Sequence, residues 1–134
     1  MPNFKLIFDE NTFGITQASL KMLRNELAKR CEHRIDIVQV QTDDICCGYL
    51  ILDLTTNEAV FTGDGFRTDG GGEGGAGFRT AYILIHTIYR LVPFQEELKI
   101  LDPLNPGPSF EKFISEYTIG SIAKPSDNNP GYVR

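Results

Sequence analysis

Residues 49–62 read YLILDLTTNEAVFT, and this stretch decides the fold class of the chain. Two runs rich in β-branched and aromatic residues, at 49–54 and 57–62, flank a short polar turn, and this pattern is typical of a β-hairpin. Runs of the same character at 34–40 (RIDIVQV) and 4–8 (FKLIF) predict two further strands. The sequence therefore predicts a sheet built mainly from the first half of the chain.

Three other segments carry apolar residues at helical spacing. The first is an amphipathic helix over about 17–31, with Thr16 as its N-cap and an apolar stripe formed by Leu20, Leu23, Leu27 and Cys31. The second, over about 77–91, is apolar on nearly all sides and stops before Pro93. The third begins at Ser109 and has one apolar face, made of Phe110, Phe113, Ile114 and Tyr117. We expect all three helices to pack on the sheet.

Together these elements predict an α+β fold: a small, mostly antiparallel sheet with a central apolar helix and two flanking helices. Residues 98–101 (LKIL) add a short edge strand. A length of 134 residues suits one domain, which we place at 1–122. The polar end, 123–134, has no core-forming pattern, and we expect a flexible C-terminal tail there.

The composition disfavours several classes of protein. A net charge of −5 argues against binding to a nucleic acid polymer, which needs a basic surface. No run approaches the roughly 18 apolar residues of a membrane helix, so we expect no membrane association. The start, MPNFKLIFDENTF, is acidic where a signal peptide would be basic. Three cysteines form an odd set without a CxxC pair, which favours reduced thiols and a cytoplasmic protein.

Two of the cysteines are adjacent, Cys46 and Cys47, and they follow Asp43 and Asp44 at the entrance of a strand. Carboxylates beside a thiol disfavour the thiolate, which is the nucleophile and the metal ligand. We therefore expect structural cysteines here. A zinc site would need two more ligands at suitable spacing.

The most unusual segment is 63–81, which reads GDGFRTDGGGEGGAGFRTA. It holds eight of the chain's 13 glycines, at positions 63, 65, 70, 71, 72, 74, 75 and 77. The tetrad Gly-Phe-Arg-Thr occurs twice, at 65–68 and 77–80. Ordering such a stretch costs about 1–2 kcal/mol of backbone entropy per residue, so its retention indicates a use.

One use is the capture of an anion. Glycine amides before a helix, with the positive end of that helix, suit a phosphate or a carboxylate. Arg67 and Arg79 would add forked, charged donors, and Phe66 or Phe78 would stack on a ring. The segment therefore predicts non-catalytic binding, or sequestration, of a small phosphorylated or nucleotide-like ligand. The amides of this site are those of Gly70, Gly71, Gly72, Gly74 and Gly75.

Known phosphate-binding motifs fit this segment poorly. A P-loop ends in Gly-Lys-Ser/Thr, and 63–92 contains no lysine. The match of 72–77 to G-x-G-x-x-G is nearly automatic in so glycine-rich a stretch. His86 and Arg90 share a polar helical stripe with Arg79, so we add both to the candidate ligand-binding residues.

Two alternatives stay open. In the first, the glycines are present because backbones or subunits pack closely there, which would make the chain a structural or assembly protein. A small phosphodiesterase-type hydrolase would instead use His86 with a carboxylate from Asp64, Asp69 or Glu73, although the same acids can pair with the two arginines. The apolar helix over 77–91 favours a homo-oligomer, and we expect neither a cofactor nor a metal ion.

The stretch at 65–76, GFRTDGGGEGGA, resembles a loop of small phage and mobile-element proteins of unassigned function. Those proteins carry Gly-Phe-x-Trp-Gly-Tyr-Gly-Gly-x-Gly-Pro before a helix rich in alanine and leucine. The likeness covers about 65–91, but this chain has no tryptophan and has Ala76 where the proline would stand. The resemblance implies a mobile-element setting, in which some small proteins act against host defence by sequestering nucleotide signals, and it implies no catalytic residue.

Overall fold

The computed structural model describes residues 4–97 and 107–118. In chain order the strands are β1 (Lys5–Ile7), β2 (Ile35–Gln41), β3 (Cys46–Asp53), β4 (Glu58–Phe61), β5 (Phe66–Arg67) and β6 (Phe94–Glu97). The α-helices are α1 (Thr16–Lys29), α2 (Gly72–Tyr82) and α3 (Gly107–Thr118). A 3₁₀ turn precedes α1 at Glu10–Thr12, and a π-helical segment extends α2 over Ile83–Ile88.

The strands form one sheet in the order β1-β4-β3-β2-β6, with short β5 beside β3. The hairpin predicted from 49–62 is confirmed as β3 and β4, which pair antiparallel with Leu50 opposite Phe61. Asn57 closes its turn with a φ of 60°. Strand β3 is also antiparallel to β2 and β5, whereas β1 and β6 lie parallel to their neighbours β4 and β2. The fold is α+β, as predicted, with a mixed sheet.

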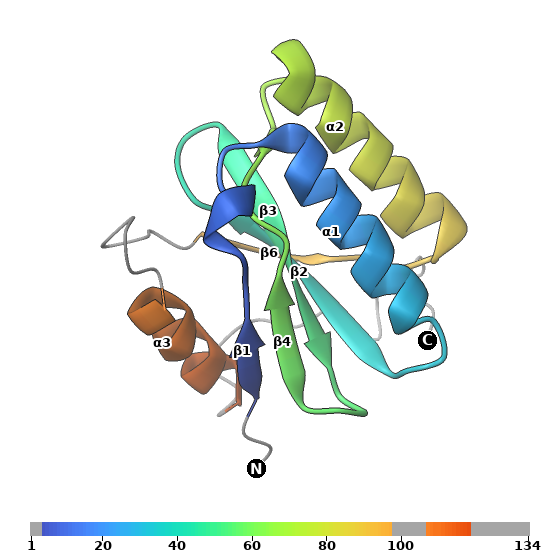
Figure 1. Cartoon of the computed structure of the whole chain (residues 1–134), viewed down its shortest axis with the longest axis vertical. Helices are drawn as coiled ribbons and strands as arrows, with labels where there is room; N and C mark the ends of the chain where they lie inside the picture. Colours follow the sequence, from blue (N-terminus) through green and yellow to red (C-terminus); the bar gives the residue numbers. More distant parts are fainter. Residues whose placement is uncertain (1–3, 98–106, 119–134) are drawn as a thin grey trace.

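Helices cover both faces of the sheet (Figure 1). Helices α1 and α2 lie side by side on one face, and α3 lies on the other, so the apolar helix is not central to the fold. Strand β2 shows the consequence, because Ile35 and Ile37 join the core under α1 and α2, while Val38 and Val40 join the core under α3. Burial on both sides explains why these strands read as nearly continuous apolar runs.

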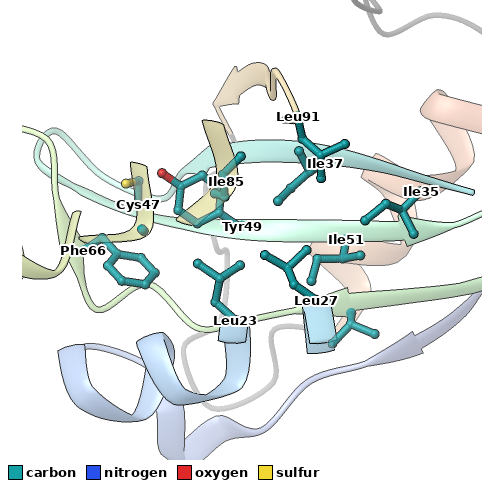
Figure 2. Close-up of a cluster of buried hydrophobic side chains, with 12 residues drawn as sticks. Leu23, Leu27, Ile35, Ile37, Cys47, Tyr49, Ile51, Phe66, Ile85 and Leu91 are labelled. Atoms are coloured by element: carbon teal, nitrogen blue, oxygen red, sulfur yellow. The ribbon is translucent and has the colours of Figure 1, made fainter. Parts of the chain in front are cut away.

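The core between the sheet and helices α1 and α2 is shown in Figure 2. Leu23 and Leu27 of α1 enter it fully buried, and Ile85 enters from the π-helical segment. Full burial of one such side chain stabilises a fold by about 1.5–3 kcal/mol. This core therefore holds both helices on the sheet.

Helix α2 begins at Gly72, whereas the sequence predicted a start near 77. Glycine is a poor helix former, which made 70–76 resemble a loop. The structure shows why glycine is required in the helix. A Cβ at Gly75 would overlap the carbonyl group of Gly70, and a Cβ at Gly77 would overlap Cγ2 of Thr16 in α1. Close packing of α2 against its neighbours thus outweighs intrinsic helix propensity.

The C-terminal part of the predicted apolar helix also differs. Regular α-helix ends at Tyr82, and the amide of Tyr89 then donates to the carbonyl of Leu84, five residues back, at 3.1 Å. Arg90, with a φ of 55°, ends the segment. The strand predicted at 98–101 and the tail at 123–134 lie outside the described residues, and β6, just before 98–101, was not predicted.

A buried arginine ties the end of α1 to the β3–β4 turn. The side chain of Arg30 is 2 % exposed, and its Nη1 lies 2.6 Å from Asp53 Oδ2 and 2.9 Å from Glu58 Oε1. Its Nη2 lies 3.0 Å from Glu26 Oε1. His33 Nδ1 is also 2.7 Å from Asp53 Oδ2. Because the loss of one partner leaves the other charge buried and uncompensated, this cluster is sensitive to the loss of one member.

Replacing Gly77 with alanine should destabilise the protein by about 1–3 kcal/mol, because the new Cβ would overlap Thr16 Cγ2. At an ordinary helical site the same change is stabilising by roughly 0.5–1 kcal/mol, so the expected sign is reversed. The double variant Thr16→Ser/Gly77→Ala removes the overlapping methyl group and keeps the hydroxyl that donates to Gly65 O at 2.6 Å. Urea denaturation should show that the double variant recovers part of the lost stability. If the effects of the two substitutions on stability simply add, the packing explanation is wrong.

Acid should remove the contribution of Asp53 to stability. Burial alone would raise the pKa of this carboxyl, but hydrogen bonds from His33, Arg30 and the amides of Thr56 and Thr55 lower it below its usual value. A lowered folded-state pKa stabilises the protein above the unfolded pKa of about 3.9, and that contribution is lost as the pH falls through the folded value.

Accordingly, Asp53→Asn should cost about 3 kcal/mol at pH 7, and its deficit relative to the native protein should shrink below about pH 4. Urea denaturation across this pH range measures the deficit. The exposed Asp44→Asn variant is the matched control and should show no comparable deficit at pH 7. A deficit for Asp53→Asn that stays constant with pH would contradict the assignment.

Candidate functional site

The site begins at Arg67 in β5, opposite Cys46 of β3. The Arg67 guanidinium grips the carboxylate of Asp69 through two contacts, Nε to Oδ1 at 3.1 Å and Nη2 to Oδ2 at 2.6 Å. The amide of Gly71 donates to the same Oδ1 at 3.0 Å. The guanidinium of Arg67 and this amide lower the pKa of Asp69. The start of α2 therefore already binds one carboxylate, which belongs to the protein itself.

Arg79, although 12 positions further along the chain, contacts the same turn. Its side chain is exposed, and Nη1 donates to the carbonyl of Gly70 at 3.4 Å. Both arginines of the repeated tetrad thus contact residues 68–72, which we call the glycine turn. Their guanidinium groups supply two positive charges next to the first turn of α2.

The backbone of the glycine turn depends on glycine at two points. Gly70 and Gly72 have φ values of 80° and 58°, and a Cβ at either would meet open space, so conformation rather than crowding requires glycine there. Gly71 is the N-cap of α2 and provides no side-chain cap. The amides of Gly72, Glu73 and Gly74 lie in the first helical turn, where no intrahelical acceptor exists. These amides and the helix dipole favour an anion at this position.

The structure reduces the set of glycine amides that were predicted to bind an anion. Gly74 and Gly75 lie within α2 and are buried, and a Cβ at Gly74 would come within 2.6 Å of Arg67 Cγ. The stem of Arg67 therefore lies across the helix at Gly74. Gly74 thus makes room for Arg67 and Gly75 for the backbone of Gly70, and of these two only the Gly74 amide belongs to the first helical turn.

The predicted aromatic residues lie differently from expectation. Phe66 is fully buried in the core, with its ring 5.6 Å from that of Tyr49 (Figure 2). In this position it cannot stack on a bound ring. Phe78 is partly buried and packs against the same core. The doublet therefore contributes its arginines to the surface and its phenylalanines to the interior.

His86 and Arg90 lie far from the glycine turn. His86 follows Gly72 by 14 residues, which at 1.5 Å per residue separates them by about 20 Å along the helix. Its ring stacks on Tyr82 with centroids 4.0 Å apart, and burial lowers the pKa of the imidazole. The hydrolase alternative requires His86 to lie beside a loop carboxylate. The structure does not bring His86 together with Asp69 or Glu73.

The acids of the glycine-rich stretch have separate roles. Asp64 accepts hydrogen bonds from the Gly14 amide at 2.8 Å and the Thr42 hydroxyl at 2.7 Å, so it connects loops. Asp69 pairs with Arg67, the alternative role that the sequence allowed for these acids. Within 4–97 and 107–118, no three His, Cys, Asp or Glu side chains gather closely enough to hold a metal ion.

The helix that reads as apolar on nearly all sides exposes part of its apolar surface. Tyr82, Ile83 and Ile88 are 53 %, 55 % and 63 % exposed. The signal was in the sequence, since a helix apolar all round must expose some of its apolar residues when only one face meets a core.

The adjacent thiols lie in a poor environment for ionisation. Burial is the main reason that the pKa of Cys47 is raised to about 12. Burial and the neighbouring Asp43 carboxylate raise the pKa of Cys46. Cys31, by contrast, is exposed, and all three thiols are free of disulfides. These positions fit the structural role expected for Cys46 and Cys47.

No protein-family model, curated protein or solved structure matches this chain. The resemblance to phage and mobile-element proteins therefore stays a prediction. No helix in the described part of the chain is long and apolar enough to cross a membrane.

Thiol labelling should separate the three cysteines. With a disulfide reagent at pH 8, Cys31 should react fast, Cys46 more slowly, and Cys47 only after unfolding, because Cys47 is buried and its pKa is about 12. Cys31→Ser should remove the fast phase and leave the others unchanged. Rapid release of three equivalents from the folded protein would contradict the burial of Cys47.

Proposed function

We propose that the protein binds a small phosphorylated or nucleotide-like ligand, without catalysis, through the anionic group of that ligand at the glycine turn. The observation that carries the proposal is that Arg67 and Arg79 both contact this one turn, next to the start of α2. Arg67 already holds a carboxylate with the forked geometry that guanidinium groups use for phosphate. A phosphate oxygen would replace or join Asp69 there.

The proposed contacts are limited to the groups that the turn presents. Arg67 and Arg79 neutralise the phosphate, and the amides of Gly72 and Glu73 donate to its oxygens. Asp69 competes for the same donors, so it weakens binding of an external anion and holds the turn together without one. A base or sugar on the ligand would lie outside the turn, because Phe66 belongs to the core.

Arg67→Ala and Arg79→Ala should each weaken binding of a phosphorylated probe by about tenfold or more, the typical effect of losing a charge-assisted hydrogen bond. Isothermal titration with ATP and with inorganic pyrophosphate measures the effect. Asp69→Asn should bind the probes more tightly than the native protein, because a competing charge is gone.

Arg24→Ala is the matched control, since Arg24 is an exposed arginine on α1. It should bind like the native protein, and circular dichroism should show all variants folded. Native binding by both Arg67→Ala and Arg79→Ala would place the site elsewhere. Recovery of an unchanged probe after denaturation supports binding without turnover, whereas a cleaved probe would favour an enzyme.

The homo-oligomer predicted from the apolar helix, the cytoplasmic location and the role in counteracting host defence are further parts of this hypothesis. Sedimentation equilibrium tests the homo-oligomer. Native mass spectrometry of the purified protein would identify a co-purified anion and so bear on the role in counteracting host defence.

A further inference from the structure

The C-terminal half of α2 and its π-helical extension present an apolar surface to solvent. We define the outer face as Arg79, Tyr82, Ile83, His86 and Ile88 together with Arg90, which follows the segment; Thr87 within it is exposed as well. It holds three of the five large apolar side chains that are exposed within the described residues. The opposite side of the same segment carries Ala81 and Ile85, both fully buried against the sheet. The segment is therefore held by the core on one side and exposes three large apolar side chains on the other.

The π-helical geometry assembles this face. In an α-helix of 3.6 residues per turn, residues five positions apart such as Ile83 and Ile88 lie about 140° apart around the axis. The five-residue hydrogen bond from Tyr89 to Leu84 widens the turn and brings such positions closer together. His86 stacks on Tyr82 and fixes that ring along the helix. The wider turn thus concentrates the exposed apolar side chains, and such turns are frequent at functional sites.

The outer face also differs in charge from the rest of the chain. All 18 acidic residues lie outside 74–95, although the chain carries a net charge of −5. Within this segment the charged residues are Arg79 and Arg90, both exposed. They are 11 residues apart in the chain, Arg79 within α2 and Arg90 after the last π-helical residue, with the exposed apolar side chains between them in sequence. The surface is a short apolar strip with a positive charge at each end.

We propose that this outer face binds an amphipathic helix of another protein whose apolar side is flanked by carboxylates. Apolar anchors at Tyr82, Ile83 and Ile88 would supply the affinity, as in other helix-against-helix recognition. Carboxylates about three turns apart on the partner would meet Arg79 and Arg90 and set its register. This partner matches the strip in both polarity and length.

A second copy of this chain fits the face less well, so the homo-oligomer predicted from the apolar helix would have to form through another surface. Two copies packed antiparallel across the outer face would place Arg79 of one against Arg90 of the other, with no acidic residue between 74 and 95 to compensate. An anionic membrane would satisfy the arginines, but it would have to accept a protein with a net charge of −5. The acidic helix satisfies both the apolar and the charged residues.

The test uses three synthetic helical peptides that share one leucine-rich face. They carry Glu, Gln or Lys at two positions 11 residues apart, and fluorescence anisotropy measures their binding to the full chain. We expect the Glu peptide to bind more tightly than the Gln peptide, and the Lys peptide to bind most weakly. Ile83→Glu and Ile88→Glu should each weaken the Glu peptide about tenfold or more. Arg90→Glu should weaken the Glu peptide and strengthen the Lys peptide.

Ile15→Glu is the matched control, because Ile15 is 52 % exposed on another part of the surface. It should bind the Glu peptide like the native protein. None of these variants alters the glycine turn, so the binding of pyrophosphate should stay native in all of them, and loss of one function is distinguishable from loss of the other.

Three results would overturn the proposal. One is equal affinity for the three peptides or no effect of Ile83→Glu. A second is a dimer that Ile83→Glu dissociates, which assigns the face to a second copy. The third is binding to vesicles containing phosphatidylglycerol that Ile88→Glu abolishes, together with no peptide binding, which assigns it to a membrane.

Discussion

The missing Cβ atoms along α2 are the constraint on which the remaining structure depends. A side chain at Gly75 would collide with the backbone at Gly70, and one at Gly77 would collide with Thr16. Without these glycines α2 would have to move away from α1 and β5, and the core that both helices share would open. The glycine-rich stretch is therefore first a packing element, and its chemistry follows from where the packing places Arg67, Arg79 and the start of the helix.

The same packing determines the electrostatics of the glycine turn. Because Gly74 leaves room for the stem of Arg67, the guanidinium reaches the first turn of α2 and lies beside amides that have no intrahelical acceptor. The carboxylate of Asp69, in the same chain, pairs with this positive charge. Under the proposed function, an external anion would have to compete with a tethered carboxylate, which would penalise weak anions and favour multivalent ones such as phosphate.

Local periodicity explains which parts of the fold were predictable. The hairpin at 49–62 follows from alternating side chains and a turn, and both properties belong to neighbouring residues. The start of α2 at Gly72 does not follow from helix propensity. Glycine is needed in this helix because of its contacts with Thr16 and Gly70. The arginine doublet was recognised, but burial of Phe66 depends on β5 pairing with β3, and no local pattern indicated so short a strand.

One helix carries both proposed functions, and Arg79 belongs to both. Its guanidinium donates to Gly70 in the glycine turn and also marks the N-terminal end of the outer face. A partner carboxylate on Arg79 would remove positive charge from the anion site, so partner and ligand would oppose each other's binding. Such coupling is reciprocal by thermodynamic necessity. Arg90 follows the π-helical segment and is not part of the glycine turn, so the coupling would act through Arg79 alone.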